Sequence, residues 1–392
     1  MKKLGMVLVC IALVLGVLWF CVGDKVKTLY TSLTSFKDEN LAYTFQHTPE
    51  IQPTKRISKG EDAFQFAKTE NIELPASFSF DGEVYPTEAF LEDTKATALL
   101  VIKDDTIRYE SYFAGGDEQT LFSSNSMGKS FVSALMGIAV AEGAVASIDD
   151  PLGRYIPEFV GTELENIPIK ACLQMASGIR FDEDTDMSGF SIRTLLGTPA
   201  MKVIVGYGVQ EAPFEYRRYL SINTEILGQV LKNATGCGLA EYMEEKLWKK
   251  IGAAHDAYWT LSNGTELAMG GLSVSLRDYA RFARLYLNEG SYCGEQILPK
   301  EWVRDSMDIS AEYARPGANG DPENMIGYGY QWWVPEGDEG EFMAIGVYGQ
   351  WIYVHPPKGI IMVKTSADPN FMDKGYEAKH IAFFRAVAQD ME

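Results

Sequence analysis

Strand-like runs stand at both ends of the main body of this chain, and helical patterns fill the sequence between them. Residues 97–102 and 106–113 form a predicted β-hairpin with its turn at Asp104 and Asp105. Three further strand-like runs (residues 342–346, 351–354 and 360–365) precede a predicted helix over residues 373–389. Because residues 150–300 are mostly helical in pattern, the order predicts an α+β fold in the form of an α/β sandwich. One antiparallel sheet would be built from both chain ends and flanked by helices, with a mostly helical inserted domain.

The N-terminus carries a separate signal. Lys2 and Lys3 precede an apolar run at residues 4–23, which as a helix would span roughly the 30 Å hydrocarbon core of a bilayer. No small-residue cleavage site follows, so we expect residues 1–23 to be a single-pass membrane anchor with the rest of the chain outside the cytoplasm. The alternative is a cleaved signal peptide and a secreted or periplasmic protein. Residues 24–75 are expected to be a spacer and N-terminal extension, and residues 76–390 a functional domain with the helical insertion at about 150–300.

The composition excludes some partners. With 35 basic and 54 acidic residues, the chain has a net charge of −19, whereas phosphate binding needs clustered Lys and Arg, so no nucleic-acid partner is expected. Neither the four histidines nor the five cysteines show metal-ligand spacing, so no metal and no cofactor are expected. Cys172, Cys237 and Cys293 allow at most one internal disulfide, which the sequence leaves open together with the oligomeric state.

Ser126 and Lys129 form the single S-x-x-K of the chain, at the start of a helical pattern over residues 126–143. Residues three apart share one helix face, and the free N–H groups at a helix start favour negative charge. A lysine one turn from a serine can accept the hydroxyl proton when burial lowers its pKa. The pair is therefore a candidate nucleophile and base, although an N-cap serine beside a surface lysine would give the same pattern.

Two further segments offer candidate groups. Tyr219 precedes a helix that begins near Asn223 or Thr224, and a tyrosine can shuttle a proton where a nearby lysine stabilises its phenolate. An ordinary half-buried tyrosine is the alternative. Gly346 and Gly349 mark a glycine-rich strand edge whose N–H groups can complete an oxyanion hole, or which is simply a β-bulge.

Taken together and in this order, these segments resemble the serine β-lactamase and penicillin-binding protein superfamily. The resemblance covers residues 76–390, is closest to the class C-like branch of esterases and 6-aminohexanoate-dimer hydrolases, and implies a β-lactamase/transpeptidase-like fold. It implies that Ser126 is the acylated nucleophile, Lys129 its activating lysine and Tyr219 the proton shuttle for the leaving group. The further implied contacts with the oxyanion or the substrate are Gln350, Gly349, Ser221 and Tyr348.

One departure from the superfamily bears on the substrate. Val347, Tyr348 and Gly349 stand where β-lactamases have Lys-Thr-Gly, so the lysine that would hold a β-lactam carboxylate is missing. Gln350 follows this triplet, and its backbone N–H is expected to bind the oxyanion together with that of Ser126. We therefore expect a serine hydrolase of the carboxylesterase or amidase type that acts on a small-molecule ester or amide. The alternatives are a penicillin-recognising D-amino peptidase or β-lactamase, and a catalytically silent, membrane-tethered binding module.

The walls of the expected pocket are less well defined. Residues 181–184 and 314–325 are expected to form its rim. Trp332, Trp333 and Trp351 are candidates to line it, although tryptophans more often belong to a core.

Overall fold

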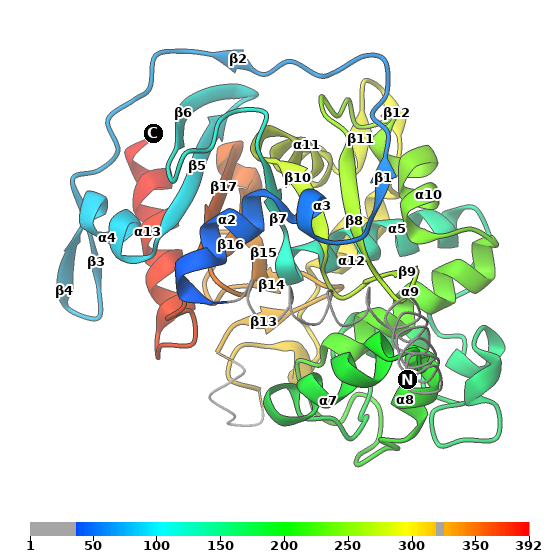
Figure 1. Cartoon of the computed structure of the whole chain (residues 1–392). Helices are drawn as coiled ribbons and strands as arrows, with labels where there is room; N and C mark the ends of the chain where they lie inside the picture. Colours follow the sequence, from blue (N-terminus) through cyan, green and yellow to red (C-terminus); the bar gives the residue numbers. More distant parts are fainter. Residues whose placement is uncertain (1–36, 319–324, 392) are drawn as a thin grey trace, which may run out of the picture.

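The computed structural model describes residues 37–318 and 325–391. Its largest sheet has eight strands in the order β13-β14-β15-β16-β17-β5-β6-β2 (Figure 1). The predicted hairpin is present as β5 (Ala96–Lys103) and β6 (Thr106–Tyr112). Between them, Asp104 and Asp105 have φ values of 49° and 58°. Two left-handed residues give a tight turn that matches the right-handed twist of the flanking strands.

The C-terminal strands complete the same sheet. They are β15 (Phe342–Gly346), β16 (Gln350–His355) and β17 (Ile360–Ser366), and β17 pairs antiparallel with β5. The prediction of one antiparallel sheet built from both chain ends is therefore confirmed. The remaining strands of this sheet are β13 (Gly327–Tyr328), β14 (Trp333–Val334) and β2 (Ala67–Lys68), of which β2 runs parallel to β6.

The side chains of β5 alternate between two hydrophobic layers. Leu100 and Ile102 belong to the larger core, which also contains residues of α5 (Lys129–Ala141) and α11 (Leu276–Leu287). Leu99 and Val101 belong to the smaller core, with residues of α13 (Tyr376–Asp390). Because successive residues of a strand point to opposite faces, the sheet is covered by helices on both sides, as predicted.

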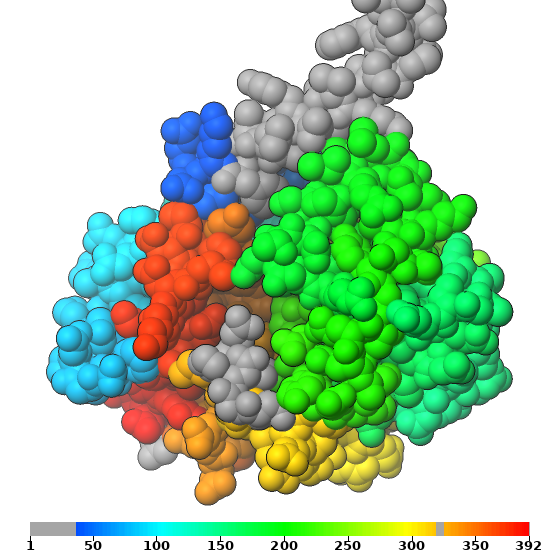
Figure 2. All heavy atoms as spheres, turned by 90° about the horizontal axis from the view of Figure 1, so that it is seen from below, coloured from blue at the N-terminus to red at the C-terminus, as the bar shows by residue number. Residues whose placement is uncertain are grey.

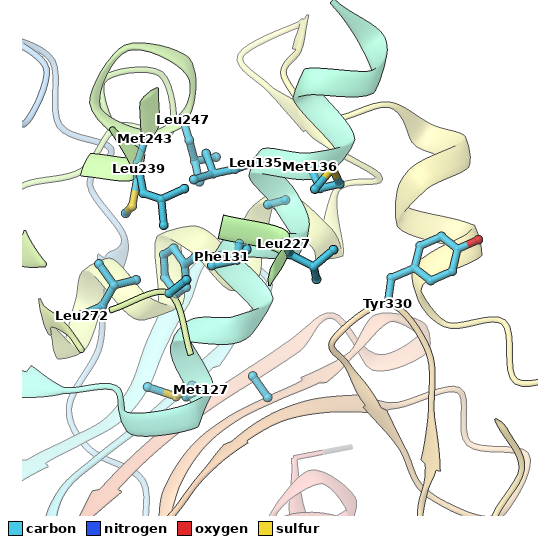
Figure 3. Packing of buried hydrophobic residues seen from close by; sticks show 14 of the residues in the cluster. Met127, Phe131, Leu135, Met136, Leu227, Leu239, Met243, Leu247, Leu272 and Tyr330 are labelled. Carbon is cyan, nitrogen blue, oxygen red and sulfur yellow. The ribbon is translucent and has the colours of Figure 1, made fainter. Parts of the chain in front are cut away.

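The stretch between β7 (Leu121–Ser123) and the C-terminal strands is mostly helical, and Figure 2 shows its middle part, about residues 150–250, in green on one side of the molecule. Its helices include α6 (Ile169–Leu173), α7 (Glu183–Leu195), α8 (Ala200–Val205), α9 (Ser221–Thr235) and α10 (Leu239–Met243). In Figure 3, Phe131 and Leu135 of α5 lie beside Leu227 of α9, so α5 connects this helical part to the sheet.

A second antiparallel sheet, which the sequence analysis did not predict, has the order β1-β8-β10-β7. It combines β1 (Thr54–Ile57), β8 (Ala257–Ser262), β10 (Leu272–Ser275) and β7, and β9 (Thr265–Glu266) pairs with β8. The other elements are α2 (Leu41–Gln46), α3 (Thr48–Ile51), β3 (Ser77–Phe80), β4 (Glu83–Pro86), α4 (Thr87–Asp93), β11 (Ser291–Tyr292), β12 (Glu295–Gln296) and α12 (Lys300–Ser306).

The prediction of a single-pass membrane protein must be corrected. Within residues 37–318 and 325–391, no helix is long and apolar enough to cross a membrane. The predicted anchor, residues 1–23, lies outside the described residues. The assignment to the cell membrane, with a domain outside the cytoplasm, is therefore withdrawn.

The three cysteines of the described residues are not paired with one another. Cys172 is buried in α6, Cys237 is half-buried and Cys293 is exposed, and all three are free thiols. The disulfide that the sequence left open is therefore not formed among them.

Candidate active site

A tight turn between β7 and α5 presents Ser126. Asn125 has a φ of 44°, a left-handed conformation that asparagine adopts more readily than most residues, and it starts the 3₁₀ turn η2 (Asn125–Gly128). Ser124 ties the turn to β10, because its N–H donates to Leu272 O at 2.7 Å and its hydroxyl accepts from Leu272 N at 3.1 Å. Ser126 is only half-buried, so the turn holds its hydroxyl at the edge of the core.

Lys129 lies next to Ser126 and is 2% exposed. Its Nζ donates to Ser126 Oγ at 2.8 Å and to Met269 O at 2.6 Å. Burial lowers the pKa of Lys129 to about 8, while the carboxylates of Glu183 and Glu225 act in the opposite direction. A lysine with this pKa is partly neutral near neutral pH, which is the form that can accept a proton.

Tyr219 lies two residues before the N-terminus of α9 and next to Lys129. The centre of its ring is 5.2 Å from Lys129 Nζ, and the ring also stacks on Trp333 with 5.4 Å between ring centroids. Burial raises the pKa of Tyr219 above its usual value, while hydrogen bonds with Ser126 and Ser221 lower it. The structure thus brings together Ser126, Lys129 and Tyr219, which are separated by up to 93 residues in the sequence.

Ser221, a predicted substrate contact, is hydrogen-bonded to Glu183. Its N–H donates to Glu183 Oε2 at 2.8 Å, and its hydroxyl donates to the other oxygen of the same carboxylate. The side chain is 5% exposed. Ser221 therefore fixes the start of α9 against the start of α7, and through α9 the position of Tyr219. Sequence analysis placed Glu183 only on the rim of the pocket.

Glu225 was not identified from the sequence at all. It lies one turn into α9, is 9% exposed, and accepts a hydrogen bond from Met269 N at 2.9 Å. Burial raises its pKa to about 7, and the positive charge of Lys129 lowers it. In the sequence, Glu225 is marked only by its position six residues after Tyr219. That spacing does not predict a contact with Lys129, which lies in another helix.

The end of β15 lies against the turn that carries Ser126. A Cβ atom on Gly346 would lie 2.5 Å from Ser124 O, so only glycine fits this close approach. The next residue, Val347, is 40% exposed, and its carbonyl accepts a hydrogen bond from Asn125 Nδ2 at 3.0 Å. The backbone at the junction of Gly346 and Val347 therefore runs beside Ser126.

Residues 348–350, which were predicted to contact the oxyanion or the substrate, follow this junction in the turn and at the start of β16. Gln350 is 1% exposed, and its side-chain amide donates to Tyr348 O at 3.1 Å. Gly349 has a φ of 85°, and a Cβ there would lie 2.6 Å from Tyr376 Oη. The Tyr348 ring packs against Phe45 with 5.3 Å between centroids. These three residues shape the turn between β15 and β16. Gln350, whose backbone N–H was predicted to bind the oxyanion, is the first residue of β16 and stands opposite Gly346 in the strand register.

Of the three candidate tryptophans, one lies at this site. Trp333 is half-buried and stacks on Tyr219, as described above. Trp332 and Trp351 are both fully buried, and they pack in the two hydrophobic cores. These two are core residues.

Two other features of the described residues, a group of possible metal ligands and a cavity, lie away from this site. In the described part of the chain, the one group of three residues that could hold a metal ion is Glu339, Glu341 and His355, at the other end of β15 and β16. A cavity of about 1040 Å³ lies beside α4 and the ends of β5 and β6, and its lining does not include the serine, lysine or tyrosine of the site.

The sequence model of the Beta-lactamase family matches residues 88–385 of this chain. The chain therefore belongs to this family, within the superfamily of serine β-lactamases and penicillin-binding proteins, and it is a hydrolase. The 6-aminohexanoate-dimer hydrolase of Paenarthrobacter ureafaciens is 26% identical to it over 347 residues, which cover 84% of this chain and 86% of that protein.

Solved structures show the same fold. A Bacillus anthracis protein with a provisional assignment as a 6-aminohexanoate-dimer hydrolase superposes with a TM-score of 0.81 at 23% identity, covering 91% of this chain and 96% of that one. A class C β-lactamase superposes with a TM-score of 0.58 at 16% identity, covering 78% and 94%. The predicted β-lactamase/transpeptidase-like fold is therefore confirmed.

Proposed function

We propose that this protein is a serine hydrolase that cleaves a small-molecule ester or linear amide through an acyl-enzyme on Ser126. The observation that carries the proposal is the 2.8 Å contact between Lys129 Nζ and Ser126 Oγ, made by a lysine that is 2% exposed. Since burial lowers the pKa of Lys129 to about 8, a useful fraction of the amine is neutral near neutral pH and can act as a general base.

In the proposed acylation, the Ser126 hydroxyl passes its proton to Lys129 while its oxygen attacks the substrate carbonyl carbon. The tetrahedral oxyanion accepts hydrogen bonds from two backbone N–H groups, each worth about 3 kcal/mol. The bond to the leaving group then breaks, and the leaving group takes a proton from Tyr219, which regains one from Lys129. A water molecule attacks the acyl carbonyl with the same groups in reversed roles, which releases the acid and restores Ser126.

The second oxyanion donor that we propose is Val347 N–H, in place of Gln350 N–H. Support comes from the backbone of Gly346, which leaves no room for a Cβ beside Ser124 O, and from the hydrogen bond between Asn125 and the Val347 carbonyl. Gln350 instead stands opposite Gly346 as the first residue of β16, after the turn, and its side chain is buried.

The residues at the end of β15 also bear on the class of substrate. If Val347 is the donor, the preceding triplet is residues 344–346, which contain no lysine, and neither do residues 347–349. Whichever triplet is aligned with Lys-Thr-Gly, the lysine that would hold a β-lactam carboxylate is missing. The relative with 26% identity is a hydrolase of a 6-aminohexanoate dimer, which makes a linear amide a suitable first substrate to test.

The test uses the full-length protein, a fluorophosphonate probe and intact-mass measurement. Ser126→Ala and Tyr219→Phe are compared with the control Ser191→Ala, which removes an exposed hydroxyl on α7. We expect one adduct in the wild type and in Ser191→Ala, and none in Ser126→Ala. Circular dichroism confirms that each variant is folded.

Three substrates separate the alternatives. Turnover of p-nitrophenyl acetate or the linear 6-aminohexanoate dimer, without turnover of nitrocefin, supports the proposed function. Turnover of nitrocefin would instead favour a penicillin-recognising enzyme. A folded wild type that forms no adduct and turns over none of the three would contradict catalysis and favour a binding module.

A further inference from the structure

The far end of the β15–β16 hairpin carries ionisable side chains that the proposed reaction does not use. Glu341 immediately precedes β15, and His355 is the last residue of β16. Because Phe342 pairs with Val354 in the antiparallel register, Glu341 and His355 are the next opposed positions and share one face of the sheet. Glu339 reaches the same place from the preceding loop, with its Oε2 3.2 Å from His355 Nε2.

We propose that Glu339, Glu341 and His355 form a binding site for a divalent transition-metal cation of the Zn²⁺ class. One ligand atom from each residue lies within 4.8 Å of the other two. Ligands of a tetrahedral zinc ion are roughly 3.4 Å apart, so the group needs to contract by a little over 1 Å at most. The Glu339 side chain is 35% exposed and can make this movement, whereas the side chains of His355 and Glu341 are each 2% exposed and are held by the sheet.

Two unpartnered polar atoms lie around the same group. Tyr353 is fully buried two residues before His355, on the same face of β16, and its hydroxyl has no hydrogen-bond partner. His355 Nδ1 is also buried without a partner. Buried polar atoms are rarely left unpaired, and a cation with a bound water would supply partners here.

Arg385 of α13 forms an ion pair with Glu341, one of the three proposed ligands. Its Nε and Nη2 both contact Oε1 of Glu341, at 2.8 Å and 2.6 Å, which leaves Oε2 of Glu341 without a hydrogen bond among the described residues. The segment of residues 336–341 carries four carboxylates (Glu336, Asp338, Glu339 and Glu341) beside this one guanidinium. A dication therefore enters negatively charged surroundings.

The ligand types indicate which cation fits. One imidazole and two carboxylates, completed by water, suit Zn²⁺ or Mn²⁺ better than Mg²⁺ or Ca²⁺, which prefer oxygen ligands alone. The sequence spacing, with the histidine 14 residues after Glu341, matches no metal-binding motif. Only the register of β15 and β16 brings these residues together, which is why the sequence analysis expected no metal.

The test is a calorimetric titration of the full-length, metal-stripped protein with ZnCl₂, together with thermal unfolding. We expect one Zn²⁺ per chain and a rise in Tm of several degrees in the wild type. His355→Gln and Glu339→Gln are expected to lose at least tenfold in affinity. The control is Glu336→Gln, which changes an exposed carboxylate of the same loop and is expected to bind like the wild type.

Two further comparisons keep the result decisive. Ser126→Ala is expected to bind Zn²⁺ unchanged, so the metal site and the proposed hydrolase activity succeed or fail separately. If His355→Gln does not fold, Glu339→Gln provides the test, because its side chain is partly exposed. A wild type that binds no Zn²⁺ at millimolar concentration, or variants that bind as tightly as the wild type, would overturn the proposal.

Discussion

Lys129 and Glu225 are linked through the backbone of Met269. Lys129 Nζ donates to Met269 O at 2.6 Å, and Met269 N donates to Glu225 Oε1 at 2.9 Å. Burial lowers the pKa of Lys129 to about 8 and raises that of Glu225 to about 7. Because each charge favours the other, the two groups influence each other's titration, and the Glu225 carboxylate partly offsets the effect of burial on Lys129.

Glu225→Gln is expected to move the acid limb of the pH–rate profile to lower pH. The negative charge of Glu225 raises the pKa of Lys129, so removing it makes the amine neutral at lower pH. If neutral Lys129 is the base, the limb of kcat/KM for p-nitrophenyl acetate should shift down by roughly one pH unit. The matched control is Glu118→Gln, an exposed carboxylate elsewhere. A limb that stays in place or moves up would argue against Lys129 as the base.

Glu183→Ala is expected to reduce both stability and kcat. Its carboxylate accepts hydrogen bonds from the N–H and the hydroxyl of Ser221, and the variant leaves these buried donors without an acceptor. The free energy of unfolding should fall by about 1–3 kcal/mol in urea denaturation. Because the start of α9 positions Tyr219, kcat should fall more than KM changes. Asp184→Ala, at the exposed next position, should leave both quantities near the wild-type values.

Gly346→Ala is expected to lower activity far more than stability. The new Cβ would lie 2.5 Å from Ser124 O, and the backbone of the turn that carries Ser126 would have to shift to accept it. A displacement of about 1 Å at a reacting group costs roughly a hundredfold in rate. Gly189→Ala is the control, since no atom lies within 4 Å of a Cβ there. Equal kcat/KM values for the two variants would contradict the placement of β15 beside Ser126.

Local signals explain which parts of the fold were predictable. The hairpin of β5 and β6 has a short β-rich run on each side of two aspartates, and Ser126 and Lys129 lie three residues apart. Both patterns are local, since the hairpin spans only residues 96–112, and over such short stretches periodicity and turn chemistry carry information. The second sheet could not be found in this way, because its five strands are only two to six residues long and come from distant parts of the sequence.

The unpredicted parts of the site depend on packing between distant segments. Glu183 and Glu225 affect Lys129 because α7 and α9 meet beside α5, and no spacing in the sequence records that contact. Gly346 and Gly349 are three residues apart, and the sequence does not tell which one lies against the turn that carries Ser126. The positive φ of Gly349 places it in the turn, so Gly346 is the residue beside Ser124.

Lys364 lies fully buried beneath the turn between β15 and β16, where an ammonium ion is poorly stabilised. Its Nζ contacts Ser366 Oγ at 2.5 Å and His380 Nε2 at 3.3 Å. Burial lowers its pKa from 10.5 to about 7. Between these two pH values the unfolded chain binds a proton that the folded chain does not. The free energy of unfolding should therefore rise with pH across this window, by at most about 1.4 kcal/mol per pH unit.

Lys364→Met removes this titration and keeps a side chain of similar length. Relative to the wild type, the variant should be most stable at pH 6, and its advantage should shrink as pH rises from about 7 towards 10. Urea denaturation at pH 6, 7, 8 and 9 measures the difference, in which the titration of Lys129 cancels because both proteins contain it. Lys55→Met, at an exposed position, should give a difference that does not change with pH. If the Lys364→Met difference is equally constant, Lys364 keeps its proton in the folded protein, and the burial of a neutral amine beneath the turn is ruled out.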